Sequence, residues 1–322
     1  MTIRVLSFEF DGCLFNRNFI ENFLDKDVIK YNKDFLDDIK HNNRLCNKVY
    51  TFVGSNRQSK LVDDYYFYKG DYIIGSCFPA VNLVNRYLGA TLDPFLLADI
   101  YCFLPDGTSY NRAVDPKYSD THAYYEFDET KATIMYAQMH KIANQHPNEV
   151  IVYDFYDSCD KTLNSLVAFY NKHKDLIPNK VTFCLHQYEG AEVTLWSTIK
   201  GEGFIDSNYR ETVRDMYTQA MVKRNCFSRT ISVVDFLNPE LLKNRKKYHD
   251  LRSLIALGVL GVGGSYCALV LAEVITGAAA ISYTLATAGL AIAALLILAE
   301  LVQQLNTEPN NRCLPEYFTK IK

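Results

Sequence analysis

Acidic and hydroxyl side chains follow short apolar runs at three places along the chain. These residues are Glu9, Asp11, Ser55, Asp154 and Asp157. A carboxylate can attack as a nucleophile, transfer a proton or bind a divalent cation, and a hydroxyl can hold a phosphate oxygen. Phosphoryl transfer needs such parts together, with fixed donors around the phosphate. The set therefore indicates phosphoryl-transfer chemistry, although each residue taken singly is also typical of a turn, a helix cap or a polar strand end.

The runs ahead of these residues are expected to be buried strands. The three strands are predicted at residues 3–10, 48–53 and 150–153. They alternate with helical stretches, which is typical of a mostly parallel sheet covered by helices. Ligands of such sheets bind outside the carboxyl ends of the strands. Residues 1–240 are therefore predicted to form one α/β domain with its site at that edge.

The remaining elements of this domain are expected on both sides of the third strand. A helix predicted over 129–146 carries Lys131 in its first turn. Further elements are a helix over 161–172, strands over 181–185 and 193–197, and a helix from 206 to about 222. The stretch at 59–123 is too long for a simple loop. We expect it to form a cap over the site, with a helix over 80–88.

Four short motifs resemble, in the correct order, those of the haloacid dehalogenase (HAD) superfamily of phosphatases. They are Phe8-Glu9-Phe10-Asp11-Gly12, Ser55 after Thr51-Phe52-Val53-Gly54, Lys131, and Asp154 with Asp157. The resemblance covers about residues 1–220 and implies a Rossmann-like HAD fold with a cap insertion. The longer stretches FEFDGCLF, FVGSNRQS and YDFYDS also resemble HAD-type effectors that Legionella-like bacteria deliver into host cells by type IV secretion. Some relatives of that kind act on phosphotyrosine.

The resemblance implies a role for each motif residue. Asp11 would be the general acid and base, and Ser55 and Lys131 would hold the phosphoryl oxygens. The implied catalytic residues are Glu9, Asp11, Ser55 and Lys131. The implied cofactor is Mg²⁺, which favours oxygen ligands. Its expected ligands are Glu9, Asp11, Asp154 and Asp157. The expected substrate-binding residues are Gly12, Asn56 and Arg57.

Glu9 departs from the family pattern, in which the nucleophile is Asp. The extra methylene moves the carboxylate by about 1 Å, and a misplacement of that size can cost on the order of 10²-fold in rate. Three interpretations stay open. Glu9 attacks from an adjusted backbone, or it only binds metal and water while the chemistry proceeds differently, or the site binds without turnover. The first two predict an Mg²⁺-dependent phosphohydrolase, and the third predicts a catalytically inactive HAD-like binding module.

Composition excludes some other classes of function. The net charge of −3 gives no field that would attract nucleic acid, so no nucleic-acid partner is expected. The 9 cysteines include no C-x-x-C pair and no zinc spacing, which is typical of reduced cytosolic thiols.

An almost uncharged segment at residues 254–302 predicts a transmembrane helical hairpin. Glu273 divides uncharged runs of roughly 18 and roughly 26 residues, each near the length that spans a bilayer. The basic segment at 241–253 predicts that both ends of the hairpin face the cytosol, and it also favours anionic lipids. A polar tail follows at 303–322.

Together these features predict an integral membrane protein, at a host-cell membrane if it is secreted. A phosphoprotein or a phospholipid is the expected substrate. A third alternative makes the hairpin itself the functional part that reshapes or permeabilises membrane. Charges that would line such a pore are missing from the hairpin sequence.

Overall fold

The computed structural model describes part of the chain, namely residues 2–22, 27–66, 68–69, 72–73, 75–115, 117 and 131–215. All of them belong to the first of two units into which the chain divides, Met1–Lys243. The expected hairpin at 254–302, its basic flank and the polar tail lie outside these residues, as do a few positions and the last residues, 118–123, of the expected cap at 59–123. Within the described ranges, no helix combines the length and hydrophobicity needed to cross a bilayer.

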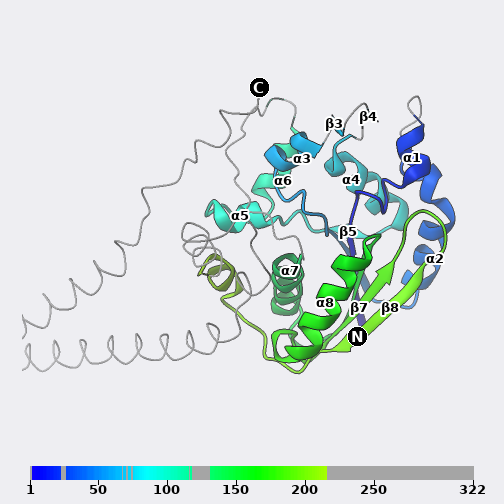
Figure 1. Cartoon of the computed structure of the whole chain (residues 1–322). Coiled ribbons are helices and arrows are strands. Elements are labelled where there is room, and N and C mark those ends of the chain that lie inside the picture. Colours follow the sequence, from blue (N-terminus) through cyan, green and yellow to red (C-terminus); the bar gives the residue numbers. More distant parts are fainter. Residues whose placement is uncertain are drawn as a thin grey trace, which may run out of the picture. The chain divides into compact units, whose positions relative to one another are not determined.

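A six-stranded sheet lies at the centre of the described domain, with strand order β5-β2-β1-β6-β7-β8 (Figure 1). Its strands are β1 Thr2–Phe8, β2 Lys48–Val53, β5 Thr91–Leu92, β6 Val150–Asp157, β7 Val181–Gln187 and β8 Thr194–Lys200. All neighbours pair in parallel except β7 and β8, which are antiparallel. The described residues also form a two-stranded sheet, β3 Tyr68–Lys69 with β4 Tyr72–Ile73. The predicted α/β class with a mostly parallel sheet is confirmed.

Helices cover both faces of the sheet (Figure 1). The α-helices are α1 Arg17–Glu21, α2 Lys33–Asn43, α3 Lys60–Tyr66, α4 Cys77–Leu88, α5 Leu97–Tyr101, α6 Thr108–Val114, α7 Ala132–Gln145 and α8 Asp160–Lys172. Two short 3-10 helices are η1 Lys30–Asn32 and η2 Lys174–Leu176. Buried side chains of α7 and α8 pack on one face, and those of α2 and α4 pack on the other.

The central strands alternate their side chains between these two cores. In β1, Val5 joins the core under α7 and α8, whereas Leu6 and Phe8 join the core under α2 and α4. In β6, Phe155 joins the core under α7 and α8, and Tyr156 joins the core under α2 and α4. Since successive residues of a strand point to opposite faces, residues of β6 that are three apart cannot share one face.

Two strand ends at the site differ from the sequence-based expectation. The first strand ends at Phe8 rather than Phe10, because Glu9 to Phe15 form a tight loop with hydrogen bonds from Phe15 N and Cys13 N to Phe10 O. The third strand continues to Asp157 instead of ending at Tyr153. Asp154 therefore lies inside a strand, where its charge needs partners from neighbouring elements.

Candidate functional site

Three of the predicted motifs meet at the carboxyl ends of adjacent strands. Glu9 directly follows β1, Ser55 comes two residues after β2, and Asp157 is the last residue of β6. Because β1 lies between β2 and β6, these side chains reach the same point. Lys131, at the start of α7, completes the group. The structure thus brings together Glu9, Ser55, Lys131 and Asp157, all of which are buried.

Gly54 allows Ser55 to approach β1 closely. A Cβ atom at Gly54 would lie 2.5 Å from Oγ of Ser7 and 2.9 Å from the ring of Phe155. Only glycine fits in that space without a shift of its neighbours. The position of Ser55 therefore depends on Gly54 as well as on β2.

The Glu9 carboxylate is the centre of the group. Its Oε1 atom accepts hydrogen bonds from Oγ of Ser55 at 2.8 Å and from the backbone N–H groups of Phe10 at 2.8 Å and Asp11 at 3.0 Å. Its Oε2 atom accepts from Nζ of Lys131. We call these four donors, from Ser55, Phe10, Asp11 and Lys131, the donor cluster. Glu9 is only 4 % exposed, so the donor cluster replaces the water that an ionised carboxylate needs.

Lys131 joins two carboxylates. Its Nζ atom also donates to Oδ2 of Asp157 at 2.6 Å, and Oδ1 of Asp157 accepts from the backbone N–H of Cys159 at 2.8 Å. The backbone of Lys131 has φ of 61°, in the left-handed region that residues other than glycine rarely adopt. Such a conformation costs of order 1–3 kcal/mol and persists where surrounding contacts enforce it. Here the two ion pairs are those contacts.

The charges in the group shift one another's pKa values. Burial alone would raise the pKa of Glu9, but the charge of Lys131 and the hydrogen bonds from Lys131 and Ser55 hold it below the usual value. Burial raises the pKa of Asp157, assisted by the charge of Glu9 and opposed by Lys131. Burial would lower the pKa of Lys131, yet the two carboxylates raise it above its usual value. Glu9 and Lys131 therefore form an ion pair at neutral pH.

Asp11 lies beside this group but is held by Arg57. Nη2 and Nε of Arg57 donate to the two oxygens of Asp11 at 2.5 Å and 3.0 Å. Nη1 donates to Asp63 at 3.0 Å and to the carbonyl of Gly75 at 2.8 Å. Arg57 is 1 % exposed, so this planar group is fixed by its buried partners. Arg57 was predicted to bind substrate, and the structure places it instead against Asp11 and Asp63.

The structure does not bring Asp154 to the other motif residues. Asp154 and Asp157 lie three residues apart in β6 and face opposite sides of the sheet. The carboxylate of Asp154 accepts from Nε of Arg4 at 2.8 Å and lies 2.8 Å from Nε2 of His186. Burial would raise the pKa of Asp154, but His186 and Arg4 hold it below its usual value. Its partners are those of a buried ion pair on the α2 side of the sheet.

The other predicted substrate-binding residues lie in the loops at the site. Gly12 has φ of 81°, and a Cβ atom there would lie 2.6 Å from Oγ of Ser158, which makes this turn specific for glycine. Asn56 is buried and follows Ser55. Asp63, which was not predicted, fixes Arg57 from α3. No local sequence signal marks Asp63, because the contact depends on how α3 folds back over the loop.

The predicted Mg²⁺ ligands do not form one set in this arrangement. Glu9 and Asp157 share Lys131, Asp11 is paired with Arg57, and Asp154 faces the other side of the sheet. Among the described residues, no three His, Cys, Asp or Glu side chains are grouped so that they could hold a metal ion. An ammonium group thus lies between the two carboxylates that a cation would bridge. These residues, as placed, do not fit Mg²⁺.

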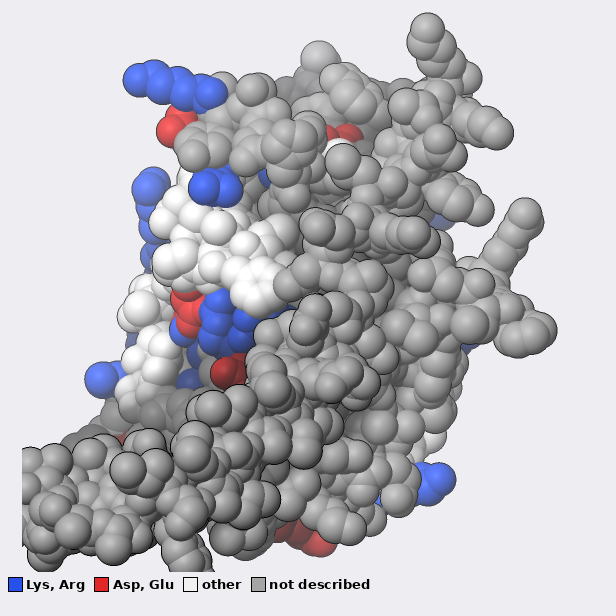
Figure 2. All heavy atoms as spheres, turned by 90° about the vertical axis from the view of Figure 1, so that its left-hand side faces the viewer, with Lys and Arg blue, Asp and Glu red and all other residues white. Residues whose placement is uncertain are grey.

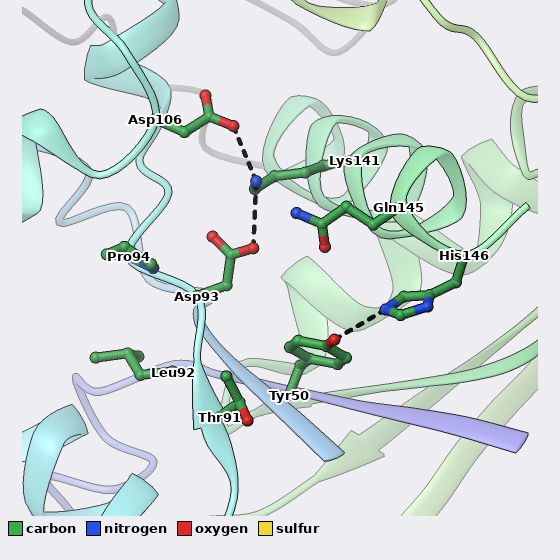
Figure 3. A pocket seen from close by; sticks show the side chains of 9 residues that line it. All are labelled: Tyr50, Thr91, Leu92, Asp93, Pro94, Asp106, Lys141, Gln145 and His146. Atoms are coloured by element: carbon green, nitrogen blue, oxygen red, sulfur yellow. Dashed lines mark hydrogen bonds and ion pairs between the residues drawn. The ribbon is translucent and has the colours of Figure 1, made fainter. Parts of the chain in front are cut away.

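A separate hollow of about 430 Å³ lies between β5, the loop after it and the C-terminal half of α7 (Figure 3). Nζ of Lys141 points between Asp93 at 3.3 Å and Asp106 at 2.8 Å. The hydroxyl of Tyr50 lies 2.9 Å from Nε2 of His146. None of the predicted site residues lines this hollow. Its charged groups, Lys141, Asp93 and Asp106, are paired with one another.

Comparisons of the sequence with family models and with curated proteins, and of the structure with solved structures, gave no match.

Proposed function

We propose that the chain is a HAD-like module in which Glu9 fills the anion site, so that it binds partners without hydrolysing phosphate. The observation that carries this proposal is the convergence of four donors on one buried carboxylate. A phosphate group requires the same kind of surroundings, that is, backbone N–H groups, a hydroxyl and a cation. In this chain the carboxylate of Glu9 accepts hydrogen bonds from these groups.

The length of the Glu9 side chain supports this proposal. An aspartate at this position is one methylene shorter, so its carboxylate would stand back from the donors and leave them for a phosphate. The glutamate carboxylate instead reaches the donors and folds back onto the N–H groups of Phe10 and Asp11. A carboxylate that accepts four hydrogen bonds and has a lowered pKa is also a poor nucleophile.

The local charge is a second support. An entering phosphate would have to displace Glu9 from the donor cluster and leave its carboxylate buried without Lys131. Removing one partner of a buried ion pair costs about 3–5 kcal/mol, because the other charge is left uncompensated. Asp11 and Asp157 stand nearby and would repel the phosphate further. Phosphate binding is therefore expected to be weak in the native chain.

The proposal places the module at a membrane. It rests on the uncharged run at 254–302 and on the basic segment at 241–253, which favours anionic lipids. Secretion into a host cell and a host-membrane location rest on the sequence resemblance alone.

Deleting residues 251–302 is expected to release the chain from membranes, because the deletion removes both predicted spans. The full chain should stay in the pellet after carbonate extraction, and the deletion variant should move to the soluble fraction. A deletion variant that still resists carbonate would rule out the hairpin as the anchor.

An Mg²⁺-dependent phosphohydrolase that acts on phosphoprotein or phospholipid is the second candidate. One observation favours it, namely that Glu9, Ser55, Lys131 and Asp157 lie together at the sheet edge with Asp11 beside them. This is the set that the motifs of the superfamily imply, apart from Asp154, which faces the other side of the sheet. It would require Glu9 to leave the donor cluster during the reaction.

An assay with 4-nitrophenyl phosphate and Mg²⁺ separates the two candidates. We expect the full native chain to hydrolyse this ester no faster than its Asp11→Asn variant. Glu9→Asp withdraws the carboxylate from the donors, and its rate should exceed both by on the order of 10²-fold. Native activity that disappears in Asp11→Asn would establish the phosphohydrolase instead.

A further inference from the structure

A second hollow, of about 550 Å³, lies beside the first residues of β2, whereas Glu9 lies at the carboxyl ends of the strands. It is formed by the C-terminal ends of α2 and α4 and by the first residues of β2. Its charged lining residues are Lys40, Arg44 and Lys48, and no Asp or Glu of the described chain lines it. We call it the basic pocket. Its volume is in the range of small-molecule binding sites, which is roughly 300–1,000 Å³.

The three cations of the basic pocket are exposed, and none has an ion pair with a described residue. Nζ of Lys40 lies 4.7 Å from the centre of the Tyr87 ring, which limits where this side chain points. At the centre of the face drawn in Figure 2, basic side chains lie next to acidic ones. Three cations without a direct ion pair around one hollow create a positive potential that attracts anions, although the charge of Lys40 also acts on Asp37 of the same helix.

Asn43 adds a buried hydrogen-bond donor to the pocket lining. Its Oδ1 atom accepts from Nη1 of Arg4 at 3.0 Å, so the amide orientation is fixed. Arg4 is held in turn by Asp154. The Nδ2 atom of Asn43 is buried and has no hydrogen-bond partner in the described structure. Because Nδ2 has no exposed surface, the exposed cations, and not this amide, are the groups that can contact a ligand in the pocket.

Two helices end at the pocket, and the negative ends of their dipoles offset part of its positive charge. The last carbonyl groups of a helix are partly negative when they lack donors. At the end of α2, the N–H groups of Arg44 and Leu45 donate to His41 and Asn42. At the end of α4, the N–H of Gly89 donates to Arg86. These carbonyl groups therefore have partners within the chain.

We propose that the basic pocket binds a small polar group that carries two or more phosphates, either a free phosphorylated inositol or the headgroup of a phosphoinositide lipid. Several separated cations suit several phosphates better than a single one, and phosphate oxygens accept from both lysine and arginine. The pocket shares no residue with the donor cluster around Glu9. This inference is therefore independent of the proposed function.

Isothermal titration of the full chain tests this inference with three probes. They are orthophosphate, inositol hexakisphosphate and water-soluble dioctanoyl phosphatidylinositol 4,5-bisphosphate. We expect binding of at least one of the two polyphosphorylated probes, and weaker binding of orthophosphate. Preference for the lipid would assign a headgroup site, and preference for inositol hexakisphosphate would assign a soluble ligand. No binding of either polyphosphorylated probe, or tighter binding of orthophosphate, would overturn the inference.

Two variants locate the binding site. A triple variant, Lys40→Gln, Arg44→Gln and Lys48→Gln, should weaken binding at least about tenfold, because it removes the cations that face the ligand. Asn43→Asp keeps the acceptor for Arg4 and adds a negative charge to the pocket lining, so it should also weaken binding of an anion. The tryptophan fluorescence of each variant verifies that it is folded.

A matched control separates a site from general charge attraction. Arg17→Gln, Lys60→Gln and Lys174→Gln together remove the same net charge from exposed or partly exposed residues outside the pocket. This control should bind within about twofold of the native chain, since exposed charges contribute little at a distance. An equal loss of affinity in the control and in the pocket variant would contradict a specific site.

Discussion

Replacing Lys131 with methionine is expected to lower the free energy of unfolding by about 3–5 kcal/mol. The methionine keeps most of the apolar volume of the lysine side chain but removes its charge. Glu9 and Asp157 would then remain buried as two carboxylates without the cation that they share. The repulsion between the two carboxylates and their burial away from water both destabilise the folded state. The same change at partly exposed Lys60, which pairs with exposed Asp64, should cost less than about 1 kcal/mol.

Urea unfolding of the full chain measures this effect. The chain has 1 tryptophan, Trp196 in β8, so its fluorescence reports on the described domain alone. Adding Glu9→Gln and Asp157→Asn to Lys131→Met removes the buried charges and should restore most of the lost stability. A loss of less than about 1 kcal/mol in Lys131→Met would contradict the buried ion-pair arrangement.

Replacing Glu9 with alanine is expected to make the chain bind orthophosphate at least about 100-fold more tightly than the native chain does. The substitution removes the carboxylate that occupies the donor cluster. The Ser55 hydroxyl, two backbone N–H groups and Lys131 would then be free to receive an anion. A difference of 100-fold corresponds to about 2.7 kcal/mol, which is within the range of one charge-assisted interaction.

Two further variants test whether phosphate occupies the place of the Glu9 carboxylate. Glu9→Gln keeps the side-chain volume and should bind phosphate nearly as weakly as the native chain. Adding Ser55→Ala to Glu9→Ala removes one donor and should weaken the gained binding about tenfold, which is the effect of about 1.4 kcal/mol. Native binding as tight as that of Glu9→Ala would show that the glutamate does not block the site.

The positions of the motifs followed from the sequence because they depend on strand periodicity. The runs before Glu9 and Ser55 are apolar and short, and both form parallel strands whose carboxyl ends meet. Lys131 was expected in the first turn of a helix, and it lies directly before α7. Contacts among neighbours of adjacent strands can be predicted once the strand order is known.

The partners of Asp154 could not be predicted in the same way. Its placement at a strand end assumed that β6 stops at Tyr153, because an acidic residue usually ends a buried run. Arg4 and His186 lie far from Asp154 in the sequence, and their contacts allow the carboxylate inside the sheet. The face of the sheet on which Asp154 lies depends on the register of the strand, and a shift of one residue would place its carboxylate on the opposite face.

The conformation of Glu9 could not be predicted from the sequence either. Sequence reasoning identified the extra methylene as a misplacement of the carboxylate, and left open whether it attacks, binds metal or is inactive. The structure shows Oε1 of Glu9 accepting from the N–H groups of its own loop. That geometry depends on the tight turn after β1, which local propensity does not specify.

A crystal structure of the native full chain, grown with Mg²⁺ and a high concentration of orthophosphate, is the decisive experiment on the role of Glu9. We expect the Glu9 carboxylate still to accept from Ser55, from the N–H groups of Phe10 and Asp11, and from Lys131, with no phosphate among these donors. A phosphate held by Ser55 and Lys131, with Glu9 turned away toward a bound cation, would contradict this expectation.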